Sequence, residues 1–298
     1  MRKINLVFRS LILISIFILI VKPTAAQVSQ IELNFGLNSG FNSTRILDKG
    51  LKSDKRYRGI PTYKWAPIGA SFGFNLANNF SMQFEALIAH EGQLFNFVDL
   101  EDKKIGEREI SLSYFNLPVL IQFRSSGKKV RTVFSIGPEI SLMRFGEETI
   151  FNESAIVTIP DGVTPPVGSV KNADGTYTIP SLGLTTIASL DGLNSEGLLK
   201  EVDFRILADV SLHIIASPKF YINVDVRSSY GFMDIRGDEL LKNIEDNTAI
   251  FDDILSQRAN FSVGVWVGLQ YYFRFDPMDI FKKRKKKEKE IEAAALLY

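Results

Sequence analysis

Cysteine is absent from this chain of 298 residues, and histidine occurs only twice. Without cysteine there is no disulfide framework, no thiolate zinc site and no thiol chemistry. The absence also excludes a lipid-modified cysteine at the end of a leader. Any catalytic histidine would have to be His90 or His213.

A hydrophobic run long enough for a transmembrane helix is also lacking. The most apolar stretch, residues 11–21, is much shorter than the roughly 20 residues that a spanning helix needs. Basic residues precede this stretch, and Thr24-Ala25-Ala26 follows it. This pattern is typical of a secretory signal peptide over residues 1–26, cleaved near Ala26. An uncleaved anchor is the alternative.

A large excess of positive charge is missing as well. The leader contains four basic and no acidic residues, so its removal lowers the net charge from +1 to −3. This balance argues against nucleic acid as a partner.

The chain does contain long segments in which apolar and polar residues alternate. The clearest runs from Asn260 to Phe273, where Phe261, Val265 and Phe273 belong to one face. Side chains alternate across a strand, and ordinary strands have about 5–6 residues, whereas a tilted membrane strand needs about 9–11. Seven further segments share the pattern: 31–38, 68–76, 80–88, 115–123, 130–139, 202–214 and 222–227.

The connections between these eight segments alternate in length. Tight turns fall at 78–79, 124–129 and 217–219, and long connections at 43–66, 94–109, 143–201 and 236–258. Outer-membrane barrels show this asymmetry, with short periplasmic turns and longer external loops. The sequence therefore predicts an all-β fold over residues 27–273, an eight-stranded antiparallel up-and-down transmembrane β-barrel. Both chain ends would lie in the periplasm, and the last strand would pair with the strand that begins at Ile31.

The placement of charge indicates which face meets lipid. The apolar faces carry no charged residue, as expected where Lys or Arg would cost roughly 2–4 kcal/mol at the bilayer midplane. The opposite faces carry acids and arginines but no lysine, and arginine is favoured in buried ion pairs. These residues form a predicted charged network inside the barrel: Glu32, Glu85, Glu139, Asp203, Asp209, Asp225, Arg131, Arg205 and Arg227. A soluble ligand-binding barrel, with the faces exchanged, is the alternative.

Eight strands leave an interior only just wide enough for side chains. The network is therefore interpreted as a plug rather than as a channel lining. His213 is in phase with Asp209 and is expected to join this interior network.

Several motifs resemble the PorT-like outer-membrane β-barrel family of Bacteroidota. Residues 75–87 are similar to its strand-turn-strand with an inward Glu, here Glu85, and 114–121 to its tyrosine-to-proline strand, with Pro118. Residues 134–140, 225–231 and 268–273 follow in the family's order. The resemblance implies a fold and an outer-membrane location. The family's name-giving member acts in protein secretion, and nothing in this sequence selects that role.

The long connections and the tail supply candidate binding regions. The first connection has seven basic and two acidic residues and is a candidate for contact with lipid headgroups through Arg45, Lys49, Lys52, Lys55, Arg56 and Arg58, with a solvated loop as the alternative. Tyr57, Tyr63 and Trp65 suit an interfacial aromatic girdle. Connection 143–201 is expected to form a β-excursion or a binding surface, or else to be disordered.

Residues 238–257 have helical spacing and predict a short helix over the rim, with no calcium-binding motif. The tail, 274–298, carries a basic run that would lie in the periplasm and could dock a partner protein: Lys282, Lys283, Arg284, Lys285, Lys286 and Lys287. A solvated helix is the alternative.

The sequence thus predicts a bacterial outer-membrane protein with a filled interior, without cofactor, metal or catalytic residues, that is structural or binds through its external loops. A subunit of an envelope assembly, such as a secretion machinery, is the alternative. A rim-sited enzyme is a weaker one, because no nucleophile–base spacing marks it.

Overall fold

The computed structural model describes residues 31–275 except 78, 160, 162, 164, 190–198 and 247–255. The predicted signal peptide, 1–26, lies outside the described residues, and so do tail residues 276–298 with the basic run 282–287. The described helices include none that is long and apolar enough to cross a membrane.

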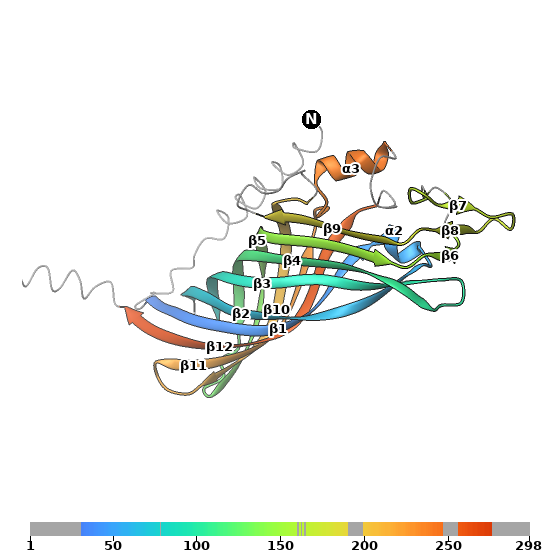
Figure 1. The fold of residues 1–298 in the computed structure, drawn as a ribbon. Helices are drawn as coiled ribbons and strands as arrows, with labels where there is room; N and C mark the ends of the chain where they lie inside the picture. The colour runs from blue at the N-terminus through green and yellow to red at the C-terminus, as the bar shows by residue number, and fades with distance from the viewer. Residues whose placement is uncertain are drawn as a thin grey trace, which may run out of the picture. The chain divides into compact units, whose positions relative to one another are not determined.

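Eight strands close into a ring (Figure 1). They are β1 (Ile31–Asp48), β2 (Tyr57–Ala77), β3 (Phe80–Val98), β4 (Lys104–Arg124), β5 (Val130–Asn152), β10 (Val202–Ile215), β11 (Phe220–Gly231) and β12 (Arg258–Phe275). Neighbours in sequence pair antiparallel from β1 to β5 and from β10 to β12. The ring is completed where β5 pairs with β10 and where β12 lies beside β1. The predicted barrel and its closing pair are confirmed.

Near the tight turns, the barrel wall has the predicted arrangement of faces. Val263, Val265, Val267 and Leu269 of β12 are exposed, and so are their counterparts on neighbouring strands. The polar residues between them are buried in the interior, as Gln270 is. An apolar exterior over a polar interior is the pattern of a membrane-spanning barrel. We call this part of the molecule the membrane section.

The strands continue well beyond the membrane section on the side of the long connections. Residues 43–48 and 57–66, predicted as loop, belong to β1 and β2, and the predicted loop 94–109 shrinks to 99–103 between β3 and β4. The predicted loop bounds were therefore too wide. We call this continuation, from about Thr44 and Thr62 outward, the external section.

The connection 143–201 forms a β-excursion, one of the two structures expected for it. After β5 the chain builds a three-stranded sheet from β6 (Ala155–Val157), β8 (Tyr177–Ile179) and β7 (Val170–Lys171), in that spatial order. It then returns along β5 as β9 (Leu182–Ser189), which pairs with Phe145–Asn152. The outer half of β5 thus has β9 as its neighbour, and the inner half has β10.

Among the described residues, two short helices belong to the external section. Helix α2 (Lys49–Ser53) connects β1 to β2, and Asp48 caps it by accepting bonds from the backbone N–H groups of Gly50 and Leu51. Helix α3 (Asp238–Glu245) follows β11 and buries Leu240 and Ile244. The predicted short helix is confirmed over 238–245.

The interior of the external section contains a large apolar core. Fourteen buried side chains form one cluster, among them Phe95 and Phe97 of β3, Ile110 and Leu112 of β4, and Val157 and Ile179 of the small sheet. The small sheet is thus anchored by side chains in the core of the external section rather than by the backbone alone.

A β-bulge in β5 lies near the boundary between the two sections. Tyr114 of β4 faces Met143, whereas Ser113 faces Phe145, so Arg144 is an extra residue. A bulge inserts one residue and thereby reverses which positions face inward. Odd-numbered Glu139 is buried below the bulge, and even-numbered Glu148 is buried above it.

Candidate functional site

The charged interior of the membrane section contains two clusters, each built around one arginine. In the first, the two Nη atoms of Arg227 contact the two carboxylate oxygens of Glu85 at 2.6 and 2.9 Å. Asp225 lies 3.0 Å from Nη2 and Asp209 lies 3.6 Å from Nε. The guanidinium also lies over the ring of Trp266, 5.1 Å from its centroid. The bidentate pair with Glu85 holds the guanidinium plane in one orientation.

The second cluster surrounds Arg205 farther toward the external section. Its Nη1 lies 2.5 Å from Glu91 and 3.7 Å from Glu139, and its Nε lies 2.8 Å from Asp203. The guanidinium lies 4.5 Å from the centroid of the Tyr114 ring. Such a stacked arginine could not be replaced by lysine without loss of contacts.

The side chains leave almost no open space between the two clusters. A cavity of about 20 Å³ lies there, with Glu91, Glu139 and Arg227 among its lining residues. That volume holds about one water molecule. The membrane section is thus filled by its side chains, in line with the predicted plug.

Seven of the nine predicted network residues belong to these clusters. Glu32 and Arg131 are half-buried near the periplasmic turns instead, where Glu32 accepts a bond from Asn75 and Arg131 donates to the carbonyl of Gly127. His213 is buried in the interior, as predicted, and stacks on Tyr221 with 4.5 Å between ring centroids. The structure thus brings seven of the nine residues together in the interior and leaves Glu32 and Arg131 apart, at the end with the tight turns.

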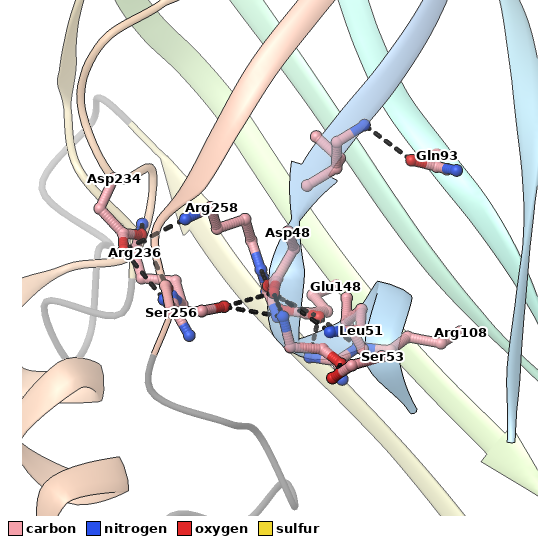
Figure 2. A network of polar contacts seen from close by, with 12 residues as sticks. Asp48, Leu51, Ser53, Gln93, Arg108, Glu148, Asp234, Arg236, Ser256 and Arg258 are labelled. Atoms are coloured by element: carbon pink, nitrogen blue, oxygen red, sulfur yellow. Dashed lines mark hydrogen bonds and ion pairs between the residues drawn. The ribbon is translucent and has the colours of Figure 1, made fainter. Parts of the chain in front are cut away.

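The external section has a charged cluster of its own, which sequence reasoning did not find (Figure 2). Arg258, at the start of β12, reaches Asp48 at 2.9 Å and Glu148 at 3.3 Å. Glu148 also pairs with Arg108 of β4 at 2.6 Å. Ser256 donates to Asp48 at 2.7 Å, so the cap of α2 is tied to the residues that lead into β12.

The segment between β11 and α3 joins the same cluster. Asp234 pairs with Arg236 at 2.9 Å and accepts a bond from the backbone N–H of Arg258 at 3.3 Å. Arg236 also donates to the backbone carbonyl of Ser256. The sticks in Figure 2 show these groups converging from the ends of several strands. We call this set the rim cluster: Asp48, Arg108, Glu148, Asp234, Arg236, Ser256 and Arg258.

Removing water from a charged group is costly, so the rim cluster persists only because each arginine meets a carboxylate. Arg108, Arg236 and Arg258 are fully buried. A sequence signal existed for most of the strand residues in the cluster: Asp48, Arg108 and Arg258 continue the inward phase of their strands, and only Glu148 is shifted by the bulge.

The predicted headgroup residues lie in different surroundings. Arg45, Lys49, Lys52, Lys55 and Arg58 are exposed, and Arg58 pairs with Asp102 on the surface. Arg56 is only 3% exposed and its Nη2 lies 2.6 Å from Asp54, so its predicted headgroup contact is wrong. Its neighbour Tyr57 is buried in the external core, so it does not belong to an aromatic girdle.

Other exposed aromatic residues lie where the membrane section meets the external section. Phe41 stacks on Trp65 at 6.3 Å, and Tyr63 is 79% exposed. Arg45 lies only about 13 Å along β1 from Phe41, at ~3.3 Å per residue. Lys49 and Lys52 of α2 lie at least about twice as far from Phe41 along the chain. Arg45 is therefore the best placed of the predicted residues for a headgroup contact.

A closed ring of eight strands, with an apolar exterior and a filled, charged interior, defines an integral outer-membrane β-barrel protein. Comparison with family models agrees: residues 25–237 match the model described as outer membrane protein beta-barrel domain. The chain belongs to this family, and it is a protein of the bacterial outer membrane.

Solved structures with a similar chain path include Ail of Yersinia pestis, with 9% identity, 80% of this chain and 98% of that chain covered, and a TM-score of 0.35. OprG of Pseudomonas aeruginosa has 10% identity, 82% and 96% coverage and a TM-score of 0.36. The protease OmpT of Escherichia coli has 9% identity, 83% and 98% coverage and a TM-score of 0.37. No curated protein matches the sequence.

Proposed function

We propose that the protein is a non-enzymatic outer-membrane barrel that presents its external section as a binding surface. The observation that carries this proposal is the separate core of the external section. A barrel that served only as a membrane anchor would not need strands that extend past the bilayer around fourteen buried apolar side chains. Such a core holds a surface in one conformation, which reduces the entropy lost on binding.

The outer surface of the small sheet is the preferred contact region. Ile156, Thr178 and Val170 face one another across β6, β8 and β7. Ile156 is 50% exposed and Val170 is 62% exposed. Asp174, in the turn before β8, accepts bonds from the side chain and backbone of Thr176, which lower the pKa of its carboxyl group. An ordered turn and two exposed apolar side chains, Ile156 and Val170, suit contact with a protein partner.

Photo-crosslinking in intact cells tests this proposal. A photoreactive amino acid at Ile156 or Val170 should give discrete crosslinked protein bands at the cell surface. The matched control is Val265, which faces lipid in the membrane section and should give lipid adducts only. Equal patterns at all three positions would refute the proposed contact region.

The filled interior supports a role other than transport. The purified protein should produce no stepwise conductance in planar bilayers, because the interior cavity holds only about one water molecule. Stable ion channels in that measurement would overturn the description of the barrel as plugged.

A subunit role in an envelope assembly, as the PorT-like resemblance implies, is the second candidate. The exposed Ile156 and Val170 of the small sheet favour it, since a permanent partner would cover them. The basic residues 282–287 would supply a periplasmic contact. Affinity capture with the full chain and with a 1–275 truncation distinguishes these contacts. Equal recovery of partners by both would show that the tail does not bind them.

Enzymatic activity is not part of the proposal. His213 is buried near the periplasmic turn after β10, whereas His90 lies on the external half of β3 and is partly exposed. The two histidines therefore belong to no common site. Activity profiling of the wild type against a variant with both histidines changed to Ala tests this: a signal lost in the variant would identify a histidine-dependent enzyme.

A further inference from the structure

The charges in the interior of the membrane section do not balance. Six buried carboxylates surround two buried arginines. They are Glu85, Asp209 and Asp225 around Arg227, and Glu91, Glu139 and Asp203 around Arg205. With the groups near the periplasmic turns included (Glu32, Arg124 and Arg131), seven acids still face four arginines.

The external section shows that the imbalance is not a general property of this barrel. There, Arg56, Arg108, Arg236 and Arg258 meet the same number of acids: Asp48, Asp54, Glu148 and Asp234. An uncompensated buried charge costs several kcal/mol in a medium of low dielectric constant. The surplus of carboxylates in the membrane section therefore calls for additional positive charge.

The small cavity lies where this charge is needed. Glu91 and Glu139 of the Arg205 cluster line it, together with the amide of Asn116 and the hydroxyls of Ser229 and Ser262. Among the buried lining residues, Oε2 of Glu91 and Oδ1 of Asn116 have no hydrogen-bond partner, and neither has Nε of Arg227, which lies 3.6 Å from Asp209. A buried acceptor without a partner normally costs about 1–3 kcal/mol. The cavity thus combines surplus negative charge with oxygen atoms that need a partner.

We propose that this cavity binds a small monovalent cation of about the size of sodium. Carboxylate, amide and hydroxyl oxygens are the ligands that hard cations prefer. Only two carboxylates line the cavity, and the described residues hold no group of three or more His, Cys, Asp or Glu side chains arranged for a metal ion. A divalent or transition-metal ion is therefore a poorer match than a monovalent ion. Arg227, which also lines the cavity, is already engaged by three carboxylates.

Refolding in a chosen salt allows the ion to bind as the barrel folds. The test therefore starts from the unfolded full-length mature chain, which is refolded from urea into detergent micelles. Refolding is carried out in sodium chloride, in potassium chloride, or in N-methyl-D-glucamine chloride of equal ionic strength. We expect the unfolding midpoint to be higher in sodium than in N-methyl-D-glucamine by at least about 2–4 °C, and to saturate as sodium increases.

Variants locate the effect. Glu91→Gln keeps the shape of the side chain but removes its charge, and should abolish the sodium dependence. Glu147→Gln, on the outer face of β5, is the matched control and should retain it. If Glu91→Gln does not fold, Glu139→Gln serves the same purpose, and the response of the wild type to the three salts remains decisive.

Equal unfolding midpoints in sodium, potassium and N-methyl-D-glucamine would overturn the proposal. In that case bound protons would carry the compensating charge, and the midpoint would depend on pH alone. Sodium dependence that survives in Glu91→Gln and Glu139→Gln would overturn the location of the site.

Discussion

The membrane section and the external section of this barrel use one wall of strands in opposite ways. In the membrane section, Val265 and Val267 face outward and Arg227 faces inward. In the external section, Ile110 and Leu112 face inward, and polar residues such as Glu109 face outward. The solvent explains the difference: lipid accepts apolar side chains at the outer surface, whereas water favours their burial inside. Each section therefore has its own core, and each should respond to different substitutions.

Loss of the central arginine should have the largest effect. Arg227→Leu leaves Glu85, Asp209 and Asp225 buried without their cation, which should destabilise the barrel by about 3–5 kcal/mol. Heat-dependent mobility on electrophoresis gels, which separates folded from unfolded barrels, measures this loss. Arg131→Leu, at the half-buried periplasmic end, is the control and should cost about 1 kcal/mol. Equal losses would show that the cluster does not stabilise the membrane section.

A cavity in the external core should damage only that section. Leu112→Ala removes buried methyl groups from the apolar cluster and should cost about 2–5 kcal/mol. Because most of the apolar cluster lies outside the membrane section, we expect proteases added outside the cell to cut the external section while the barrel stays folded in the membrane. Simultaneous loss of both sections would show that they unfold as one unit.

A lysine on the outer surface should distinguish the two sections directly. Val265→Lys faces lipid and should cost roughly 2–4 kcal/mol. Thr149→Lys faces water on the outer half of β5 and should change the free energy of unfolding by less than about 0.5 kcal/mol. Chemical denaturation in lipid vesicles gives both values. A tolerated lysine at residue 265 would place this part of β12 outside the bilayer.

The smallest effect is expected for a surface ion pair. Arg58 and Asp102 are both more than half exposed, and such pairs contribute about 0–1 kcal/mol. Arg58→Ala should therefore leave the unfolding midpoint almost unchanged. Arg258→Ala, in the rim cluster, is the informative counterpart, because it leaves Asp48 and Glu148 short of a buried partner and should expose the external section to proteolysis.

The residues show why sequence reasoning succeeded in one section and not in the other. Alternation in β12 and the presence of arginine without lysine were enough to identify the lipid face and most of the Arg227 and Arg205 clusters. Glu91 was overlooked as an interior residue, although it is in phase with Glu85 on the same strand. Asp48, Arg108 and Glu148 were placed in loops. The bulge at Arg144 shifts the inward phase of Glu148. Asp48 and Arg108 keep the phase of their own strands, but charged residues stand there at inward positions between apolar ones, so the simple apolar–polar alternation is lost.

The sequence by itself determined the barrel, its number of strands, its lipid-facing side and its location in the outer membrane. The reason is that few folds other than a membrane barrel suit strands in which apolar and polar residues alternate strictly and charges occur on the polar face only. Only the tertiary structure decided where the strands end, how β9 replaces β10 along the outer half of β5, and which arginine meets which acid. These features depend on contacts between residues far apart in the chain, such as Arg258 with Asp48 at 2.9 Å. The pattern along one strand contains no information about such partners.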